Sequence, residues 1–280
     1  MKPYTLFINE DYKKLNWRSS GSNPVYKVED EEETDREGRP HYIIKDYDGD
    51  SHRENVEIVA SRIYEALGAK TTNPQLKNIL MKTNDGKKIE IKGLFSEFQE
   101  DLHPLTVEAA LALPMNKKIE IANHFIASVL VRNHDVVGFS FDNLMYNKKT
   151  KNIYHVDAGG AFDMRAQGEI KSGLKNKTSD REDNAHPFPR EPEELESMVF
   201  SGKGASKLFF PLLRDLLLNK SGQGSNALES AGKKLKSVSD STLRSIVIDG
   251  GLSEDFANRL VERKKRILDR LPDLIKKIKE

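Results

Sequence analysis

The chain has 280 residues, with 45 Lys or Arg against 44 Asp or Glu, and its formal net charge is +1. This near-neutral balance gives no electrostatic reason to expect nucleic-acid binding, and the lack of cysteine excludes disulfides and thiolate metal sites. No segment approaches the roughly 20 apolar residues of a transmembrane span, and the start of the chain lacks the apolar run of a secretory signal. We therefore expect a soluble protein of a reducing compartment.

The first 100 residues are predicted to form mainly strands, with one helix. Residues His41–Lys45 are a short β-rich run. Apolar residues recur at helical spacing over 53–67, and Gly68 ends that helix. Residues 87–98 alternate weakly and are predicted to form two strand pieces around Gly93.

Beyond residue 100 the pattern becomes mainly helical. We expect helices at 105–113 and 117–132, short strands at 143–146 and 153–156, a long loop at 165–192, and helices from 193 to the end. A connector near Gln99–Pro104 separates the two regions. The predicted fold class is therefore α+β, with a small strand-rich N-terminal lobe at 1–100, a larger helical C-terminal lobe at 101–280, and a cleft between them.

An acid, an amide and a second acid stand at the ends of apolar segments in the helical region. Asp135 follows a long helix, Asn143 begins the next strand, and Asp157 follows another strand just before Gly159-Gly160. A magnesium–nucleotide phosphoryl-transfer site requires a carboxylate that orients a hydroxyl, and an amide and a carboxylate that hold metal on the phosphates. Each residue alone also suits an ordinary cap or turn, and Asp142 is an alternative ligand to Asn143.

Residues of the strand-rich region complete this arrangement. Lys45 ends a strand and Glu57 lies on the following helix, and a lysine fixed against nucleotide phosphates is paired in this way with a helix carboxylate. The alternative is two ordinary surface charges. The turn at Gly21-Ser22 precedes a strand and would let backbone N–H groups approach phosphate, although an ordinary turn uses the same residues.

The histidines near the acids are predicted to be structural. His134 and His155 flank Asp135 and Asp157 and are expected to be packed or hydrogen-bonded, whereas His124 is expected to lie half-exposed on a helix. No histidine spacing indicates a zinc site.

Together these residues resemble the protein-kinase-like superfamily, in the style of its HipA-like and phosphatidylinositol-kinase-like branches. The resemblance covers residues 15–170, and its most specific part is the segment from Asn133 to Gly160. It implies that Lys45, fixed by Glu57, holds the ATP phosphates. It also implies that Asp135 is catalytic and that Asn143 and Asp157 bind Mg²⁺ or Mn²⁺. Further nucleotide contacts are implied for the glycine turn and the adenine-facing hinge, namely Gly21, Ser22, Glu97 and Gln99.

The chain departs from the family pattern in three places. Asn143 follows Asp135 by eight residues instead of the usual five, with 136–141 inserted. Ala158 stands where many kinases carry the Phe of Asp-Phe-Gly, and no Ala-Pro-Glu signature follows. These departures leave a pseudokinase or scaffold as an alternative to an active enzyme.

Some secreted bacterial effector kinases of this remote type require host inositol hexakisphosphate as an activator. By resemblance, cations on the long loop and the last helix are candidates for binding such a polyanion: Arg165, Lys171, Lys175, Arg263 and Lys264. The alternative is solvated faces balanced by neighbouring acids. The compartment implied is the bacterial cytoplasm or a host cell into which the protein is secreted.

The sequence as a whole predicts an ATP- and Mg²⁺-dependent phosphotransferase, in its most specific form an atypical protein Ser/Thr kinase. Its partner would be a protein with an acceptor hydroxyl. Beside the pseudokinase or scaffold, the alternative is an inositol-phosphate or lipid kinase. No nucleic acid and no transmembrane segment are expected; residues 267–278 allow weak contact with an anionic membrane surface, although packing within the lobe is the better interpretation.

Overall fold

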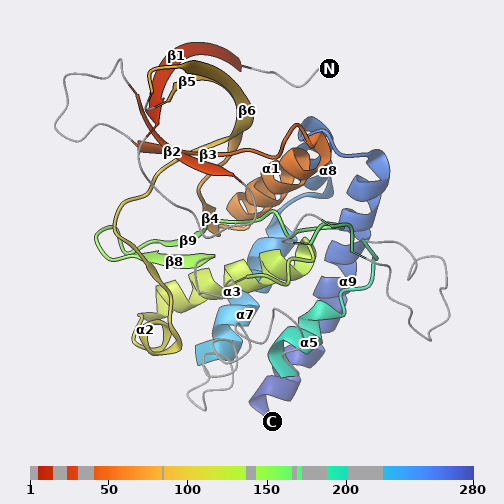
Figure 1. Cartoon of the computed structure of the whole chain (residues 1–280). Helices are drawn as coiled ribbons and strands as arrows, with labels where there is room; N and C mark the ends of the chain where they lie inside the picture. The colour runs from red at the N-terminus through yellow and green to blue at the C-terminus, as the bar shows by residue number, and fades with distance from the viewer. Residues whose placement is uncertain are drawn as a thin grey trace.

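A small barrel occupies the N-terminal part of the molecule (Figure 1). The computed structural model describes residues 6–14, 24–30, 41–83, 85–136, 143–165, 169–171, 188–200 and 223–280. Within these residues the barrel order is β1-β2-β3-β6-β5, closed by a parallel pairing of β1 with β5. Its strands are β1 (Leu6–Lys14), β2 (Val25–Asp30), β3 (His41–Lys45), β5 (Gln75–Lys82) and β6 (Lys88–Glu97).

The barrel interior explains the direction in which Lys45 points. Val28, Ile44 and Phe95 are buried inside the barrel together with further apolar residues of β5 and β6. Because successive side chains of a strand lie on opposite faces, the inward position of Ile44 places Lys45 on the outer face of β3. That face is directed toward the helix that follows in the chain.

A second, smaller sheet lies below the barrel in Figure 1. Its order is β4-β9-β8-β7, and its strands are β4 (Lys70–Thr71), β7 (Leu102–Pro104), β8 (Leu144–Asn147) and β9 (Ile153–His155). The chain leaves the barrel at Glu97 and enters this sheet at Leu102. The intervening connector is fixed to the barrel at its start, because the Phe98 N–H donates to the His41 carbonyl at 2.7 Å.

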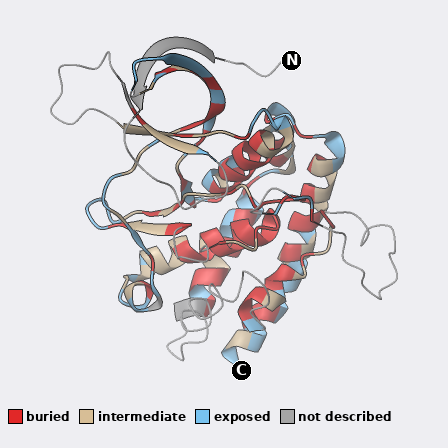
Figure 2. Ribbon diagram, in the orientation of Figure 1, coloured by how far each residue is buried: buried red, intermediate tan, exposed pale blue. Residues whose placement is uncertain are grey.

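Helices form the remainder of the described structure, and α3 lies among them. The helices are α1 (Ser51–Ala66), α2 (Val107–Leu111), α3 (Met115–Leu130), α5 (Glu194–Phe200), α7 (Gln223–Ser237), α8 (Asp240–Asp249) and α9 (Glu254–Lys279). Figure 2 shows that their buried residues face the interior between them. The main core includes Phe125 of α3, Leu228 of α7 and Leu260 of α9.

Helix α1 is packed on the helical part while it faces the barrel. Val59 and Ile63 are fully buried in the main core, and the Asn55 side chain donates to the Gly251 carbonyl at 3.2 Å. Toward the barrel, the buried Glu54 carboxylate lies 2.9 Å from Lys92 of β6. The division of the chain at residue 100 stays a prediction, and α1 shares its core with the helices that follow it.

The predicted fold class, α+β with a small strand-rich part and a larger helical part, is confirmed. The prediction of two strand pieces around Gly93 is wrong, because β6 continues through that residue. Gly93 lets β6 approach β3 closely, because a Cβ at this position would lie 2.7 Å from the Lys45 carbonyl oxygen of β3. None of the described helices is long and apolar enough to cross a membrane.

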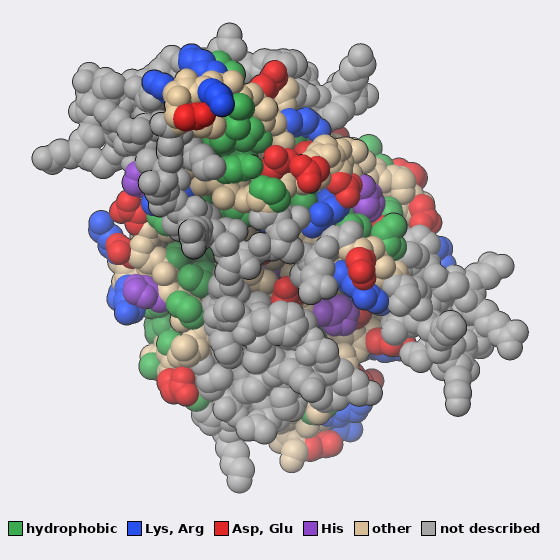
Figure 3. All heavy atoms as spheres, viewed as in Figure 1, with side chains coloured by type: hydrophobic (Ala, Val, Ile, Leu, Met, Phe, Trp, Pro, Cys, Tyr) green, Lys and Arg blue, Asp and Glu red, His purple; other side chains and the backbone are tan. Residues whose placement is uncertain are grey.

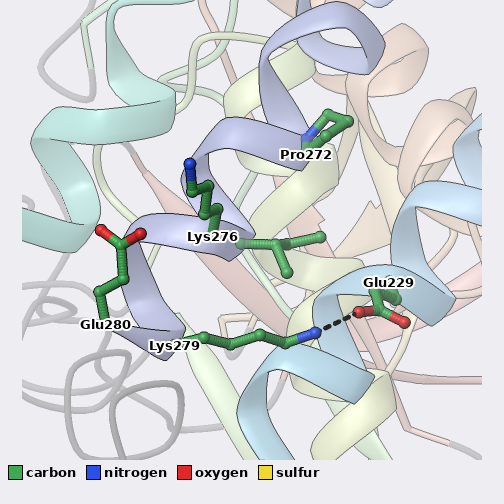
Figure 4. Close-up of a pocket in the computed structure, with 6 residues that line it drawn as sticks. Glu229, Pro272, Lys276, Lys279 and Glu280 are labelled. Carbon is green, nitrogen blue, oxygen red and sulfur yellow. Dashed lines mark hydrogen bonds and ion pairs between the residues drawn. The ribbon is translucent and has the colours of Figure 1, made fainter.

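The C-terminal end of α9 bears a pocket of about 490 Å³ (Figure 4). Its lining comes from the last turns of α9 and from Glu229 of α7, which lies 2.9 Å from Lys279. In Figure 1 this end of α9 is far from β3. Ile267, Leu271 and Leu274 of the segment 267–278 are buried in the main core. The weak membrane contact expected for this segment stays a prediction.

Acidic and basic side chains are interspersed over the coloured part of the face shown in Figure 3. This distribution agrees with the net charge of +1.

Gly93→Ala tests the close approach that positions Lys45. The added Cβ meets backbone atoms of β3, which cannot rotate away, so we expect the free energy of unfolding to fall by roughly 1–3 kcal/mol. Denaturant unfolding measures the change. Ser96→Ala on the same strand is the control, because it removes an atom and adds none, and equal stability of Gly93→Ala and the parent protein would contradict the argument.

Candidate functional site

The site is built around the ammonium group of Lys45. Its Nζ atom lies 3.1 and 3.0 Å from the two carboxylate oxygens of Glu57 and 2.9 Å from Oδ1 of Asp157. Lys45 comes from β3, Glu57 from the middle of α1, and Asp157 from the loop after β9. One cation therefore joins the barrel to the two elements that carry the carboxylates, and its side chain is only 15% exposed.

Burial and the shared cation together shift the pKa values of Lys45, Glu57 and Asp157. Burial lowers the pKa of Lys45, but Asp157 and Glu57 outweigh burial and hold that pKa well above its ordinary value. Burial raises the pKa of Glu57 despite the opposing effect of Lys45. Burial also raises the pKa of Asp157, but Lys45 and the Gly159 N–H outweigh burial and bring that pKa below its ordinary value. Glu57 is therefore the first of the two carboxylates to take up a proton as the pH falls.

Tyr47 adds a second donor to Glu57. Its hydroxyl donates to Oε2 of Glu57, the oxygen nearest to Lys45. Burial raises the pKa of the Tyr47 hydroxyl, and Glu57 raises it further, so the group remains a donor across the physiological range. Tyr47 also sets a limit on the neighbouring loop, because a Cβ on Gly159 would lie 2.8 Å from its hydroxyl oxygen.

Asp157 has a defined orientation. The Gly159 N–H donates to Oδ1 at 2.9 Å, the same oxygen that contacts Lys45. A glycine at 159 fits this turn, since a side chain would meet Tyr47, Asp157 and Glu57. These contacts involve Oδ1, which makes Oδ2 the candidate oxygen donor for a cation.

Asp135 and Asn143 are held together although eight residues separate them. The Asn143 side-chain amide donates to the Asp135 carbonyl at 2.8 Å, and the Asn143 carbonyl accepts from Val156 N–H at 2.9 Å. Donation by Nδ2 fixes the orientation of the amide and leaves Oδ1 as its acceptor oxygen. Most of the intervening segment, including the alternative ligand Asp142, lies outside the described residues.

A buried, uncharged network supports the Asp135 loop. Asn133 accepts from the Asp135 N–H at 3.0 Å through Oδ1, and its amide nitrogen lies 3.2 Å from the Tyr64 hydroxyl and 3.0 Å from Nε2 of His155. Burial lowers the pKa of His155 to about 4 and that of His124 to about 3, so both imidazoles are neutral near pH 7. His155 is thus the hydrogen-bonded residue that the sequence predicted.

The prediction that His124 is half-exposed is wrong, because its side chain is fully buried beside Tyr64. The helical spacing held the signal, since His124 lies between Ile121 and Ser128 on the inner face of α3.

A charged network, which the sequence did not reveal, lies behind the same loop. Glu194 of α5 is buried and contacts Arg132 Nε at 3.2 Å, His134 Nε2 at 3.2 Å and the guanidinium of Arg263. Burial raises the pKa of Glu194, but Arg263 and His134 outweigh burial and hold the pKa well below its ordinary value. The backbone before Asp135 is therefore tied to α5 and α9.

Three of the five proposed polyanion-binding cations are buried and hydrogen-bonded within the protein. Arg263, Lys264 and Lys171 are 0%, 6% and 9% exposed, and protein oxygens accept from all three: Arg263 donates to Val129, Pro189 and Glu191 carbonyls, Lys264 to the Val238 carbonyl and Asp240, and Lys171 to three carbonyls. This expectation is corrected, because burial removes these cations from solvent.

The α9 sequence carried a signal for that burial. Arg263 and Lys264 fall on the same helix stripe as Leu260, Ile267 and Leu271, all of them buried. Arg165 is half-exposed and paired with Glu169, and Lys175 lies outside the described residues.

The remaining predicted contacts lie at the edge of the described site. Glu97 is an exposed residue at the end of β6, and Gln99 lies in the connector between barrel and second sheet. Gly21 and Ser22 lie outside the described residues.

The donor set fits a metal that is shared with a phosphate ligand. Within the described residues, no group of three or more His, Cys, Asp or Glu could hold a metal alone. Carboxylate and amide oxygens suit Mg²⁺, which takes few protein ligands and completes its coordination with phosphate oxygens and water. Asp157 and Asn143 match that requirement.

Comparisons with known proteins give distant structural likeness. No protein-family model matches the chain. No curated protein matches its sequence. The chain is similar to the crystal structure of a Helicobacter pylori proinflammatory kinase, CtkA, with a TM-score of 0.49 and 14% identity over 96% of this chain and 99% of that chain. It is also similar to HipA of Shewanella oneidensis MR-1, from a complex of a toxin–antitoxin system with HipB and operator DNA, with a TM-score of 0.33 and 12% identity over 86% of this chain and 60% of that chain.

Proposed function

We propose that this protein is an ATP- and magnesium-dependent phosphotransferase that phosphorylates a hydroxyl group. The observation that carries the proposal is the ammonium of Lys45, which contacts Glu57 of α1 and Asp157 of the loop after β9. A lysine fixed by a helix carboxylate, beside a metal-binding aspartate, is the arrangement that phosphoryl transfer by a kinase requires. The formed Lys45–Glu57 pair favours an active enzyme over a pseudokinase or scaffold.

In this proposal Lys45 contacts the α- and β-phosphates, and Glu57 and Tyr47 hold it in place. The contact between Lys45 and Asp157 at 2.9 Å loosens when phosphate oxygens arrive, because they compete for the same donors. Glu97 and Gln99 would line the adenine end, and backbone N–H groups at Gly21 and Ser22 would face the phosphates. The barrel thus covers the nucleotide, while the acids come from the elements below it.

Asp157 and Asn143 would hold the Mg²⁺, or Mn²⁺ in its place, through Oδ2 and Oδ1. Bound there, the ion would bridge phosphate oxygens and neutralise the charge on the transferred group. Asp135 would accept or orient the proton of the acceptor hydroxyl. The network through Asn133, with its 3.0 Å contact to the Asp135 N–H, holds the backbone from which that carboxylate extends.

We propose a Ser or Thr hydroxyl of a protein as the acceptor. A highly charged inositol phosphate needs exposed converging cations, whereas Lys171, Arg263 and Lys264 are buried. An inositol-phosphate or lipid kinase would yield a labelled soluble or lipid product while protein acceptors stay unlabelled, and this product analysis separates the two functions.

Asp157→Ala tests the metal role. We expect phosphoryl transfer from labelled ATP to fall by at least about 10²-fold, the effect of removing a preorganised electrostatic contact. Circular dichroism should show an intact fold. Asp269→Ala, at an exposed position of α9, is the matched control and should keep full activity. Full transfer by folded Asp157→Ala would contradict the assigned role.

Asp135→Ala tests the role of the catalytic carboxylate. Turnover should fall roughly 10²- to 10⁴-fold, the usual contribution of a general base. Binding of Mg²⁺–ATP, measured by calorimetry, should change little because Asp135 faces the acceptor and not the nucleotide. A variant that loses nucleotide affinity in proportion to turnover would speak against this division of roles.

Tyr47→Phe tests the support of Glu57 through pH dependence. Burial raises the pKa of Glu57 above its ordinary value, and the hydrogen bond from the Tyr47 hydroxyl partly offsets this rise because it favours the charged carboxylate. Its loss should raise that pKa further. Because the ionised Glu57 is present above its pKa and lost as the pH falls through it, nucleotide affinity should fail at a higher pH in Tyr47→Phe. The nucleotide titrates in the same way in experiments with both proteins, so its titration cancels in the comparison. Identical acidic limbs in the two curves of nucleotide affinity against pH would refute the coupling between Tyr47 and Glu57.

A further inference from the structure

Lys171 is a buried lysine outside the Lys45 site, and the hydrogen bonds described for its side chain all go to backbone carbonyl oxygens. Nζ of Lys171 lies 2.6 Å from the Arg132 carbonyl, 2.8 Å from the Gly160 carbonyl and 3.0 Å from the Phe162 carbonyl. Burial, and after it Arg132, lower the pKa of Lys171 well below its ordinary value. The three carbonyl acceptors favour the ammonium form, because only that form has the three N–H donors that they match. Lys171 is 9% exposed, which leaves little access for an external anion.

The three carbonyls belong to the two loops that carry the proposed catalytic and metal-binding acids. Arg132 precedes Asp135 by three residues, and Gly160 follows Asp157 by three. The loops also meet directly, because the Phe162 N–H donates to the Val131 carbonyl at 2.5 Å. Lys171 therefore lies at the junction between the Asp135 loop and the Asp157 loop.

Two of these residues have unusual backbone conformations. Arg132 has φ 55° and Phe162 has φ 49°, a left-handed region that costs energy for residues other than glycine. Such conformations persist where surrounding contacts fix them. The ammonium of Lys171 supplies one such contact to the carbonyl of each residue.

A short turn-back of the chain brings Lys171 to this junction. Met164 and Ile170 form an antiparallel bridge, the Arg165 N–H donates to the Glu169 carbonyl at 2.7 Å, and the Lys171 N–H donates to the Asp163 carbonyl at 2.5 Å. The segment that continues from the Asp157 loop thus returns and inserts its lysine between both loops.

We propose that Lys171 is a positioning residue that holds the Asp135 and Asp157 loops in one mutual geometry. The inference rests on the proposed function for the meaning of that geometry, since phosphoryl transfer requires the acceptor oxygen and the metal-bound phosphate to be aligned. A residue needed only for general stability would affect the whole fold instead of these two loops.

The test compares Lys171→Met, Lys171→Gln and Arg165→Met. Methionine keeps most of the side-chain volume without a donor, glutamine keeps two N–H donors, and Arg165 lies in the same turn-back but is paired with Glu169. Amide hydrogen exchange is followed at Asp135, Gly159 and Phe162. Turnover and the affinity for a Mg²⁺-bound, non-hydrolysable ATP analogue are measured on the same proteins.

We expect Lys171→Met to speed exchange in both loops together while α3 and α9 stay protected. Its turnover should fall about 10²-fold, the effect of a misplacement of about 1 Å. Affinity for the Mg²⁺-bound analogue should fall less than turnover, because Lys45 and the barrel are untouched while the Asp157 loop loosens. Lys171→Gln should give an intermediate turnover, and Arg165→Met should match the parent protein.

Unchanged exchange in both loops of Lys171→Met would overturn the proposal. Loss of the whole fold in both Lys171 variants would overturn it as well, because Lys171 would then serve general stability. If the parent protein transfers no phosphoryl group, the proposed function fails, and the exchange measurement still decides whether Lys171 joins the two loops.

Discussion

The sharing of one buried ammonium between two carboxylates is the interaction on which the site depends. Lys45 comes from the barrel, whereas Glu57 and Asp157 come from elements packed in the helical part. Removing these charges from water is costly, and only good geometry offsets the cost. Contacts that fix α1 supply that geometry: Lys92 pairs with the buried Glu54 at 2.9 Å on the barrel side, and α8 packs on the opposite side, where Gly250 leaves no room for a side chain against Val59.

Two different kinds of interaction fix the turn that carries Asp135. Neutral hydrogen bonds through Asn133 reach the Asp135 backbone and add no charge next to the Asp135 carboxylate. Further back, Glu194 gathers Arg132, His134 and Arg263 from other elements. The Asp135 loop is therefore held both by neutral hydrogen bonds and, through the residues before Asp135, by a charged network.

Residues with local signals could be predicted from the sequence, and residues placed by tertiary packing could not. A lysine at the end of a strand, followed by a glutamate on the next helix, suggested that Lys45 and Glu57 form a pair, and the structure brings them together. Tyr47 and Glu194 gave no such signal, because their partners are set by how α1, α5 and α9 pack. Lys171 falls within the predicted long loop, and nothing in its neighbours along the chain indicates the three carbonyls that surround it.

The decisive measurement is a structure of the protein with Mg²⁺ and a non-hydrolysable ATP analogue. We expect Nζ of Lys45 within hydrogen-bond distance of a phosphate oxygen, Glu57 still in contact with Lys45, and the ion bound by Asp157 and Asn143. A nucleotide bound away from Lys45, or an ion held without Asp157, would contradict the proposed site.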